Sequence, residues 1–155
     1  MEKLRHKKKT IKMWSKENLK EYMIKEVEII QDTIKRMSFN SFIVKGWTVT
    51  LVVATLLLKG TEIQIFIAFV PLLIFWILDA YFLRQERIYR KLYDWVINNR
   101  LKTKEFLFDM NANRFKDEVQ SIPRIMFSIT LVLFYVPILV LVIIYVLVLF
   151  GKVCH

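Results

Sequence analysis

Apolar residues are concentrated in three stretches of the chain. The first two cover about residues 42–58 and 63–83, and only residues 59–62 separate them. The third covers residues 125–150 and contains no charged residue. As helices, the shortest stretch would be about 26 Å long and the longest about 39 Å, against a hydrocarbon core of about 30 Å. The pattern predicts an all-α integral membrane protein with three transmembrane helices, of which the first two form a hairpin.

The residues before the first span have the periodicity of an amphipathic helix. A helix is expected from Ser15, which suits an N-cap, to Met37. Such a helix could pack either on a second cytosolic helix of its own chain or on a neighbouring subunit. The polar run 38–41 either loosens the helix before the membrane or caps the first span. The apolar positions form a seam with steps of four and three at Leu19, Met23, Val27, Ile30, Ile34 and Met37.

The segment 84–124 between the second and third spans is expected to be cytosolic. Helical periodicity continues from the second span to about Asn98, so this helix leaves the bilayer. Residues 111–113 predict a turn with a short helix after it, and Ser121 with Pro123 suits the start of the third span. The expected parts of the chain are 1–41 (basic tail and amphipathic helix), 42–83 (hairpin), 84–124 (cytosolic helical segment), 125–150 (third span) and 151–155 (external tail).

The basic residues fall mainly in two of these parts. Eleven Lys and Arg precede residue 42 and ten lie in 84–124, whereas 59–62 and 151–155 hold one Lys each. The positive-inside rule therefore predicts a cytoplasmic N-terminus and an external C-terminus. Because the apolar region begins about forty residues into the chain, the first span is expected to remain as an anchor rather than be cleaved as a signal peptide.

Composition argues against an enzyme. The chain has 155 residues, is 55% hydrophobic and carries a formal net charge of +10, which indicates one small membrane unit. Its one cysteine and two distant histidines cannot build a metal cluster, and no Gly-rich phosphate loop or nucleophile with a nearby histidine is present. No catalytic residue, metal or cofactor is expected.

Each arm of the predicted hairpin holds one charged residue, Lys45 and Asp79. If the turn is centred between residues 60 and 61, the two lie at similar depth and can meet, as charges within spans usually do. Both are also close to the cytoplasmic interface, where Lys can snorkel and Asp can reach water. They are thus either a structural pair or part of a water-lined pore mouth.

Small residues recur every fourth position on the first span, at Gly46, Thr50 and Ala54. Such a ridge lets helix backbones approach closely. It could serve self-association or packing against the second or third span of the same chain. Because three short spans rarely enclose a functional cavity, a homo-oligomer is expected.

Two groups of basic residues could bind an anionic partner. Near a membrane surface each basic residue contributes about 1 kcal/mol of attraction to anionic lipid. Gathered by oligomerisation, they could instead bind a nucleotide or a single-stranded oligonucleotide. The first group is a stripe at steps of three and four, without acidic partners at such spacing on its helix: Arg84, Arg87 and Lys91. The second group is the N-terminal tail: Lys3, Arg5, Lys7, Lys8, Lys9 and Lys12.

Two motifs flank the hairpin. Asn40-Ser41-Phe42-x-x-Lys45-Gly46-Trp47 begins it, and Phe75-Trp76-x-x-Asp79-Ala80-Tyr81-x-x-Arg84-Gln85-Glu86-Arg87 ends it. Over residues 38–97 the chain resembles the small bacterial SLATT-type membrane effectors of anti-phage defence, the group that includes the membrane subunit of the Hailong system. The resemblance implies a pore-forming effector of the bacterial inner membrane, controlled by a nucleotide-derived signal from a partner nucleotidyltransferase, that depolarises the cell on infection.

The expected function is therefore an oligomeric ion channel gated from its basic cytosolic face. The alternative is a non-conducting membrane anchor or adaptor. An adaptor would recruit a cytosolic partner through the seam of residues 15–37.

Overall fold

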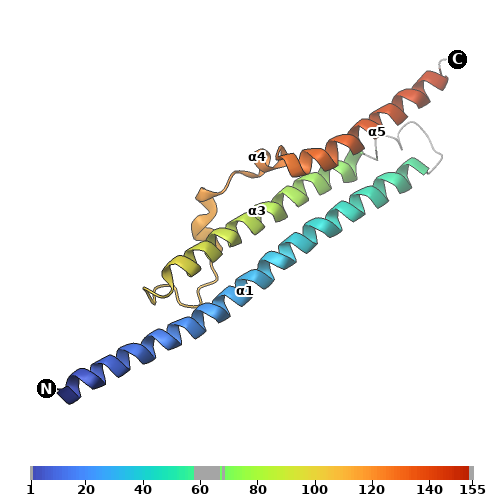
Figure 1. The fold of residues 1–155 in the computed structure, drawn as a ribbon. Coiled ribbons are helices and arrows are strands. Elements are labelled where there is room, and N and C mark those ends of the chain that lie inside the picture. Colours follow the sequence, from blue (N-terminus) through green and yellow to red (C-terminus); the bar gives the residue numbers. More distant parts are fainter. Residues whose placement is uncertain (1, 58–66, 68, 154–155) are drawn as a thin grey trace. The chain divides into compact units, whose positions relative to one another are not determined.

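The computed structural model describes the backbone of residues 2–57, 67 and 69–153, and the side chains of residues 16–57, 67 and 69–148. Within these ranges the chain is helical and has no strand. The predicted external loop of the hairpin, residues 59–62, lies outside them. The elements are α1 (Glu2–Leu57), α3 (Phe69–Asn99), the 3-10 helix η1 (Ala112–Glu118), α4 (Ile122–Met126) and α5 (Ile129–Val153) (Figure 1).

Helix α1 is longer than the sequence predicted. A helix was expected to begin at Ser15 and to be loosened or interrupted at residues 38–41, but α1 continues through both places. No proline occurs in α1, and Gly46 is its one glycine. Ser41 does not cap a new helix, because its hydroxyl donates to the carboxylate of Asp79 instead of accepting from the backbone. The expected start at Ser15 and the cap at residues 38–41 were therefore wrong.

The residues divide into two compact units. The amphipathic unit comprises Met1–Arg36 and Glu86–Val119, and the apolar unit comprises Met37–Gln85 and Gln120–His155. Helices α1 and α3 each contribute residues to both units.

The predicted seam of α1 forms part of the core of the amphipathic unit. Ile30 of α1 packs with Ile88 and Leu92 of α3, and all three are fully buried. Other seam residues pack against this cluster, namely Met23, Val27 and Ile34. Of the two partners considered for the seam, the structure supplies the chain's own α3. Burial of such side chains contributes about 1.5–3 kcal/mol each.

In the apolar unit every helix turns one narrow face inward. The inward residues of α1 and α3 repeat every fourth position, at Val44, Thr48 and Val52 and at Leu72, Trp76 and Ala80. Tyr135 and Val142 are the matching fully buried residues of α5. Its remaining faces are open, since Leu133, Leu141 and Leu147 are 65–70% exposed. An apolar helix so exposed differs from the buried core helix of a soluble protein.

Two helices among the described residues are long and apolar enough to cross a membrane. They contain the stretches Lys16–Leu57 and Ile129–Val148. Residues 63–83, predicted as the second span, are described at 67 and from Phe69 onward, and α3 is not one of the two.

The third predicted span begins later than expected. The sequence predicted one helix from residue 125, but α4 ends at Met126 and α5 begins at Ile129. Between them the Ser128 amide donates to the Ile125 carbonyl (2.8 Å), and the Ser128 carbonyl accepts from Val132 (2.9 Å) to start α5. Pro123 occupies the first turn of α4 rather than that of the long helix.

Candidate functional site

The carboxylate of Asp79 is the centre of a polar cluster in the apolar unit. Asp79 is fully buried, and the Lys45 ammonium lies 2.6 Å from its Oδ2. The hydroxyl of Ser41 donates to Oδ1, and that of Tyr135 donates to Oδ2 over 3.2 Å. Helices α1 and α5 thus supply the partners of a carboxylate on α3. Such partners are what make a buried carboxylate tolerable in an apolar environment.

The local helix geometry places each partner. Ser41 and Lys45 are one turn apart on α1, and the ammonium also donates to the Ser41 hydroxyl over 2.8 Å. Tyr135 is held by its ring, which stacks on Trp76 with a centroid distance of 5.4 Å and an interplanar angle of 4°. Trp76 lies three residues before Asp79 on the same helix, so one face of α3 sets both the ring and the carboxylate.

The two charges of the cluster differ in access. The side chain of Asp79 is fully buried, whereas that of Lys45 is 26% exposed. The ring of Phe134 lies 5.9 Å from the Lys45 ammonium and gives it a further attractive contact. The cation is therefore the member of the pair that can reach an outside partner, while the anion stays enclosed.

Side chains of the apolar unit also donate to backbone carbonyls of neighbouring helices. The Trp76 indole N–H donates to the Met126 carbonyl (3.0 Å), at the end of α4. The Tyr145 hydroxyl of α5 donates to the Leu56 carbonyl of α1 (3.0 Å). Terminal carbonyls of a helix have no partner within the helix, and in an apolar environment an unsatisfied one is costly. The bond from Trp76 therefore holds the end of α4, and the bond from Tyr145 joins α5 to α1.

The ridge of small residues faces away from the rest of the apolar unit. Gly46, Thr50 and Ala54 are exposed, and a methyl group added at Gly46 would meet nothing within 4 Å. The inward face of α1 is offset from the ridge by two residues. Among the described residues the ridge is thus exposed, and its use by a second copy stays a prediction.

The predicted basic stripe is partly paired. Arg84 donates from Nε to the Gln120 carbonyl (3.1 Å). Lys91 lies 3.6 Å from a Glu118 carboxylate oxygen, so it has an acidic partner outside its own helix. Glu118 belongs to η1, which is far from Lys91 in sequence, so helical spacing could not predict this contact. Arg87 also has an interaction partner. The side chains of the basic tail lie outside the described residues.

The amphipathic unit contains a second buried ion pair, which the sequence did not reveal. Arg100 and Glu26 are 0% and 1% exposed, and Arg100 Nη2 donates to Glu26 Oε1 over 2.9 Å. Arg100 also donates to the carbonyls of Glu105 (2.7 Å) and Phe106 (3.0 Å), while the Phe108 amide donates to Glu26 (2.7 Å). The pair thereby fixes the loop after α3.

The loop after α3 contains two residues with an unusual backbone conformation. Phe106 and Phe108 have positive φ angles of 54° and 57°, which non-glycine residues seldom adopt without compensating contacts.

The sequence signal that could have revealed the Arg100–Glu26 pair is the position of Glu26, three residues after Met23 and four before Ile30. A carboxylate in line with an apolar seam needs a buried partner.

Comparison with models of protein families, with curated proteins and with solved structures gives no match. The resemblance of residues 38–97 to SLATT-type effectors therefore stays a prediction from the two motifs. In the part of the chain that the structure describes, no three His, Cys, Asp or Glu side chains are grouped so that they could hold a metal ion.

Proposed function

We propose that the protein is a homo-oligomeric membrane effector that conducts ions and depolarises the bilayer. Each subunit would cross the bacterial inner membrane three times, with its N-terminus in the cytoplasm and its C-terminus outside. The observation that carries the proposal is the Asp79 cluster, in which a charged pair lies inside an apolar unit and leaves its cation, Lys45, 26% exposed. Intramembrane charges that retain access to an outside partner are typical of ion pathways.

The pathway in this proposal lies between subunits. Within one subunit Asp79 is enclosed, so the exposed part of Lys45 is the group that can face water. The open ridge at Gly46, Thr50 and Ala54 supports close approach of a second copy to the same helix. Together the two features favour an oligomer whose α1 helices lie next to the pore.

Gating is assigned to the cytosolic face. The signal would be a nucleotide or single-stranded oligonucleotide made by a partner nucleotidyltransferase, as the resemblance over residues 38–97 implies for anti-phage defence. The large excess of basic residues before residue 42 and in 84–124 supports an anionic ligand, or anionic lipid, on this side.

The adaptor alternative loses its main support. It relied on the seam of residues 15–37 to recruit a partner, but Ile30 is fully buried and its seam neighbours pack against α3. A recruiting partner would have to displace α3 from this core, which is more costly than binding an exposed face. The conducting oligomer is therefore the function that the described contacts support best.

Reconstitution into planar bilayers tests the proposal. Current is expected from the purified oligomer, with its open probability changed by oligonucleotides. Lys45→Gln removes a positive charge from the pathway, so the reversal potential in a KCl gradient should shift toward greater cation permeability. Lys35→Gln is the control, because Lys35 is exposed in the amphipathic unit. Absence of current from folded oligomer, with and without oligonucleotides, would rule out the channel.

A further inference from the structure

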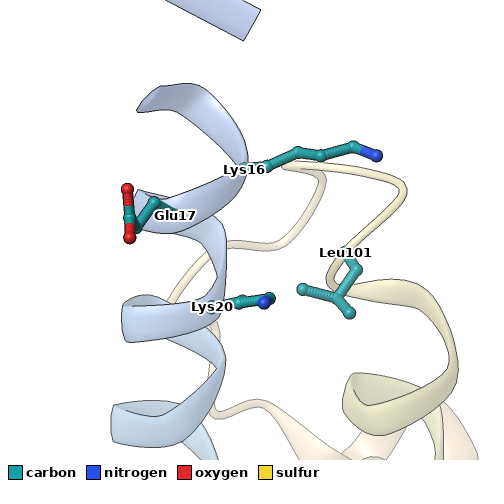
Figure 2. A pocket seen from close by; sticks show the side chains of 4 residues that line it. All are labelled: Lys16, Glu17, Lys20 and Leu101. Carbon is teal, nitrogen blue, oxygen red and sulfur yellow. The ribbon is translucent and has the colours of Figure 1, made fainter. Parts of the chain in front are cut away.

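A recess of about 470 Å³ lies in the amphipathic unit, between α1 and the loop that follows α3 (Figure 2). Its described lining consists of Lys16, Glu17 and Lys20 from α1 and Leu101 from the loop. Pockets for small molecules have volumes of about 300–1,000 Å³. The recess is therefore large enough for an organic ligand of moderate size.

The described lining of the recess carries two positive charges and one negative charge. Figure 2 shows Lys16 and Lys20, one helical turn apart, extending on the side of the loop that carries Leu101, whereas the Glu17 carboxylate points away from it. Among the described residues neither ammonium forms a hydrogen bond or ion pair, unlike those of Lys25 and Lys35 on the same helix. Two unneutralised cations at one recess attract an anion and favour one with several charges.

The wall opposite the lysines is apolar and fixed. Leu101 is 43% exposed, so a ligand can cover its side chain. The adjacent Arg100 binds the carbonyls of Glu105 and Phe106 together with Glu26, which holds the loop in place before any ligand arrives. A preorganised wall lowers the entropy lost on binding.

We propose that this recess binds a small soluble organic phosphate. The phosphate groups lie against Lys16 and Lys20, and an apolar ring such as a nucleobase covers Leu101. Ammonium groups suit phosphates as point charges, and two of them match a diphosphate or triphosphate better than a single phosphate. As a ligand site for a gated channel the inference rests on the proposed function, but binding itself requires no conduction.

Binding of ATP to the full chain in nanodiscs of zwitterionic lipid tests the charge requirement. The double substitution Lys16→Ala with Lys20→Ala should weaken ATP binding at least tenfold, measured by isothermal titration calorimetry. The matched control, Lys25→Ala with Lys35→Ala, removes the same charge from the same helix and should stay within twofold of the wild type. Equal losses in both variants, or no binding at millimolar ATP, would overturn the proposal.

A second arm tests the apolar wall and the source of the phosphate. Leu101→Ala should weaken ATP but leave inorganic tripolyphosphate unchanged, because only ATP carries a ring. Nanodiscs that contain phosphatidylglycerol should bind ATP as tightly as zwitterionic ones at equal ionic strength after correction for surface potential. If the anionic lipid abolishes ATP binding through the two lysines, the recess is a headgroup site and the soluble ligand is excluded.

Conduction and binding can fail separately. Bilayers without current, combined with ATP binding that depends on Lys16 and Lys20, would refute the channel and keep the recess as a ligand site. Current that oligonucleotides modulate equally in the wild type and in the Lys16→Ala, Lys20→Ala variant, without ATP binding, would refute the recess alone.

Discussion

Among the described residues, Glu26 and Asp79 are almost completely buried carboxylates in ion pairs, and their cations differ in exposure. In the amphipathic unit Arg100 and Glu26 are both sealed from solvent, and the arginine also binds loop carbonyls. In the apolar unit Asp79 is equally sealed, but its partner Lys45 is 26% exposed. A guanidinium offers five donors in a rigid fork, whereas an ammonium is a compact charge on a flexible stem. The first pair is suited to fixing a loop and the second to exchanging partners.

The burial of the cation therefore distinguishes a structural pair from a functional pair more clearly than the presence of an ion pair does. Removal of one partner from a sealed pair leaves a charge that has no alternative, and the loss in stability is large. A cation at the edge of its cluster can turn outward when its partner is lost. The substitutions below test this difference, starting with the largest expected effect.

Arg100→Ala should produce the largest loss. It leaves Glu26 buried without its cation and frees the loop carbonyls, so the free energy of unfolding should fall by about 3–5 kcal/mol. Denaturant titration of the full chain in detergent, followed by circular dichroism, measures the change. Arg36→Ala removes an exposed arginine from α1 of the same unit and should cost less than about 1 kcal/mol. Equal effects of the two substitutions would show that the Arg100 pair contributes nothing special.

Substitutions at the Asp79 cluster should be asymmetric. Lys45→Leu leaves the carboxylate enclosed with two hydroxyl donors and should cost about 3 kcal/mol. Asp79→Leu should cost less, because the partly exposed Lys45 can turn outward. The double variant should recover stability relative to Lys45→Leu, which a double-mutant cycle measures as a coupling energy.

Current recordings on the same three variants separate the two interpretations of the pair. If each single substitution cripples conduction and the double variant restores it, the pair is structural and the pore-mouth interpretation fails. If conduction or selectivity remains altered in the double variant, Lys45 acts on the ions themselves.

Trp76→Phe should have a smaller effect. It removes the indole donor to the Met126 carbonyl and leaves that carbonyl without its side-chain partner, at a cost of about 1–3 kcal/mol. The denaturant midpoint of the apolar helices reports the change. Trp47→Phe is the matched control, because Trp47 is 55% exposed. A larger loss at Trp47 would contradict the assigned role of Trp76.

Lys25→Ala should have the smallest effect. Lys25 and Glu21 form an exposed pair at 2.9 Å, and salt and water screen such pairs strongly. The denaturant midpoint should remain within error of the wild type at moderate salt. A loss comparable with that of Arg100→Ala would mean that pairing rather than burial determines stability in this unit.

Helical periodicity was sufficient to predict the all-α class and the C-terminal end of α3. The step of three and four residues predicted the face that holds Ile30, and the same spacing placed the helix end near Asn98, one residue before α3 ends. The contact between Lys45 and Asp79 was predicted from their similar depth in the hairpin, because helix rise and a short turn fix which residues lie opposite one another. The first two features depend on helical spacing, and the third on a short connection between two helices; both can be read from the sequence.

Contacts between distant residues account for what the sequence did not reveal. The break at Phe127–Ser128 has no glycine or proline, and its Met126 carbonyl is satisfied by Trp76, fifty residues earlier. The loop that Arg100 binds depends on Glu26, seventy-four residues earlier. Ser41 looked like a cap but serves Asp79. In each case a polar group has a partner that no local pattern specifies.

The chain order of the Asp79 partners has a consequence for synthesis. Ser41 lies 38 residues before Asp79, and Tyr135 lies 56 residues after it. Because a ribosome makes the N-terminal residues first, Ser41 and Lys45 already exist when Asp79 emerges. The two charges can thus neutralise each other before the helix that carries Tyr135 has been translated. Packing of α5 then completes a cluster whose charges are already matched.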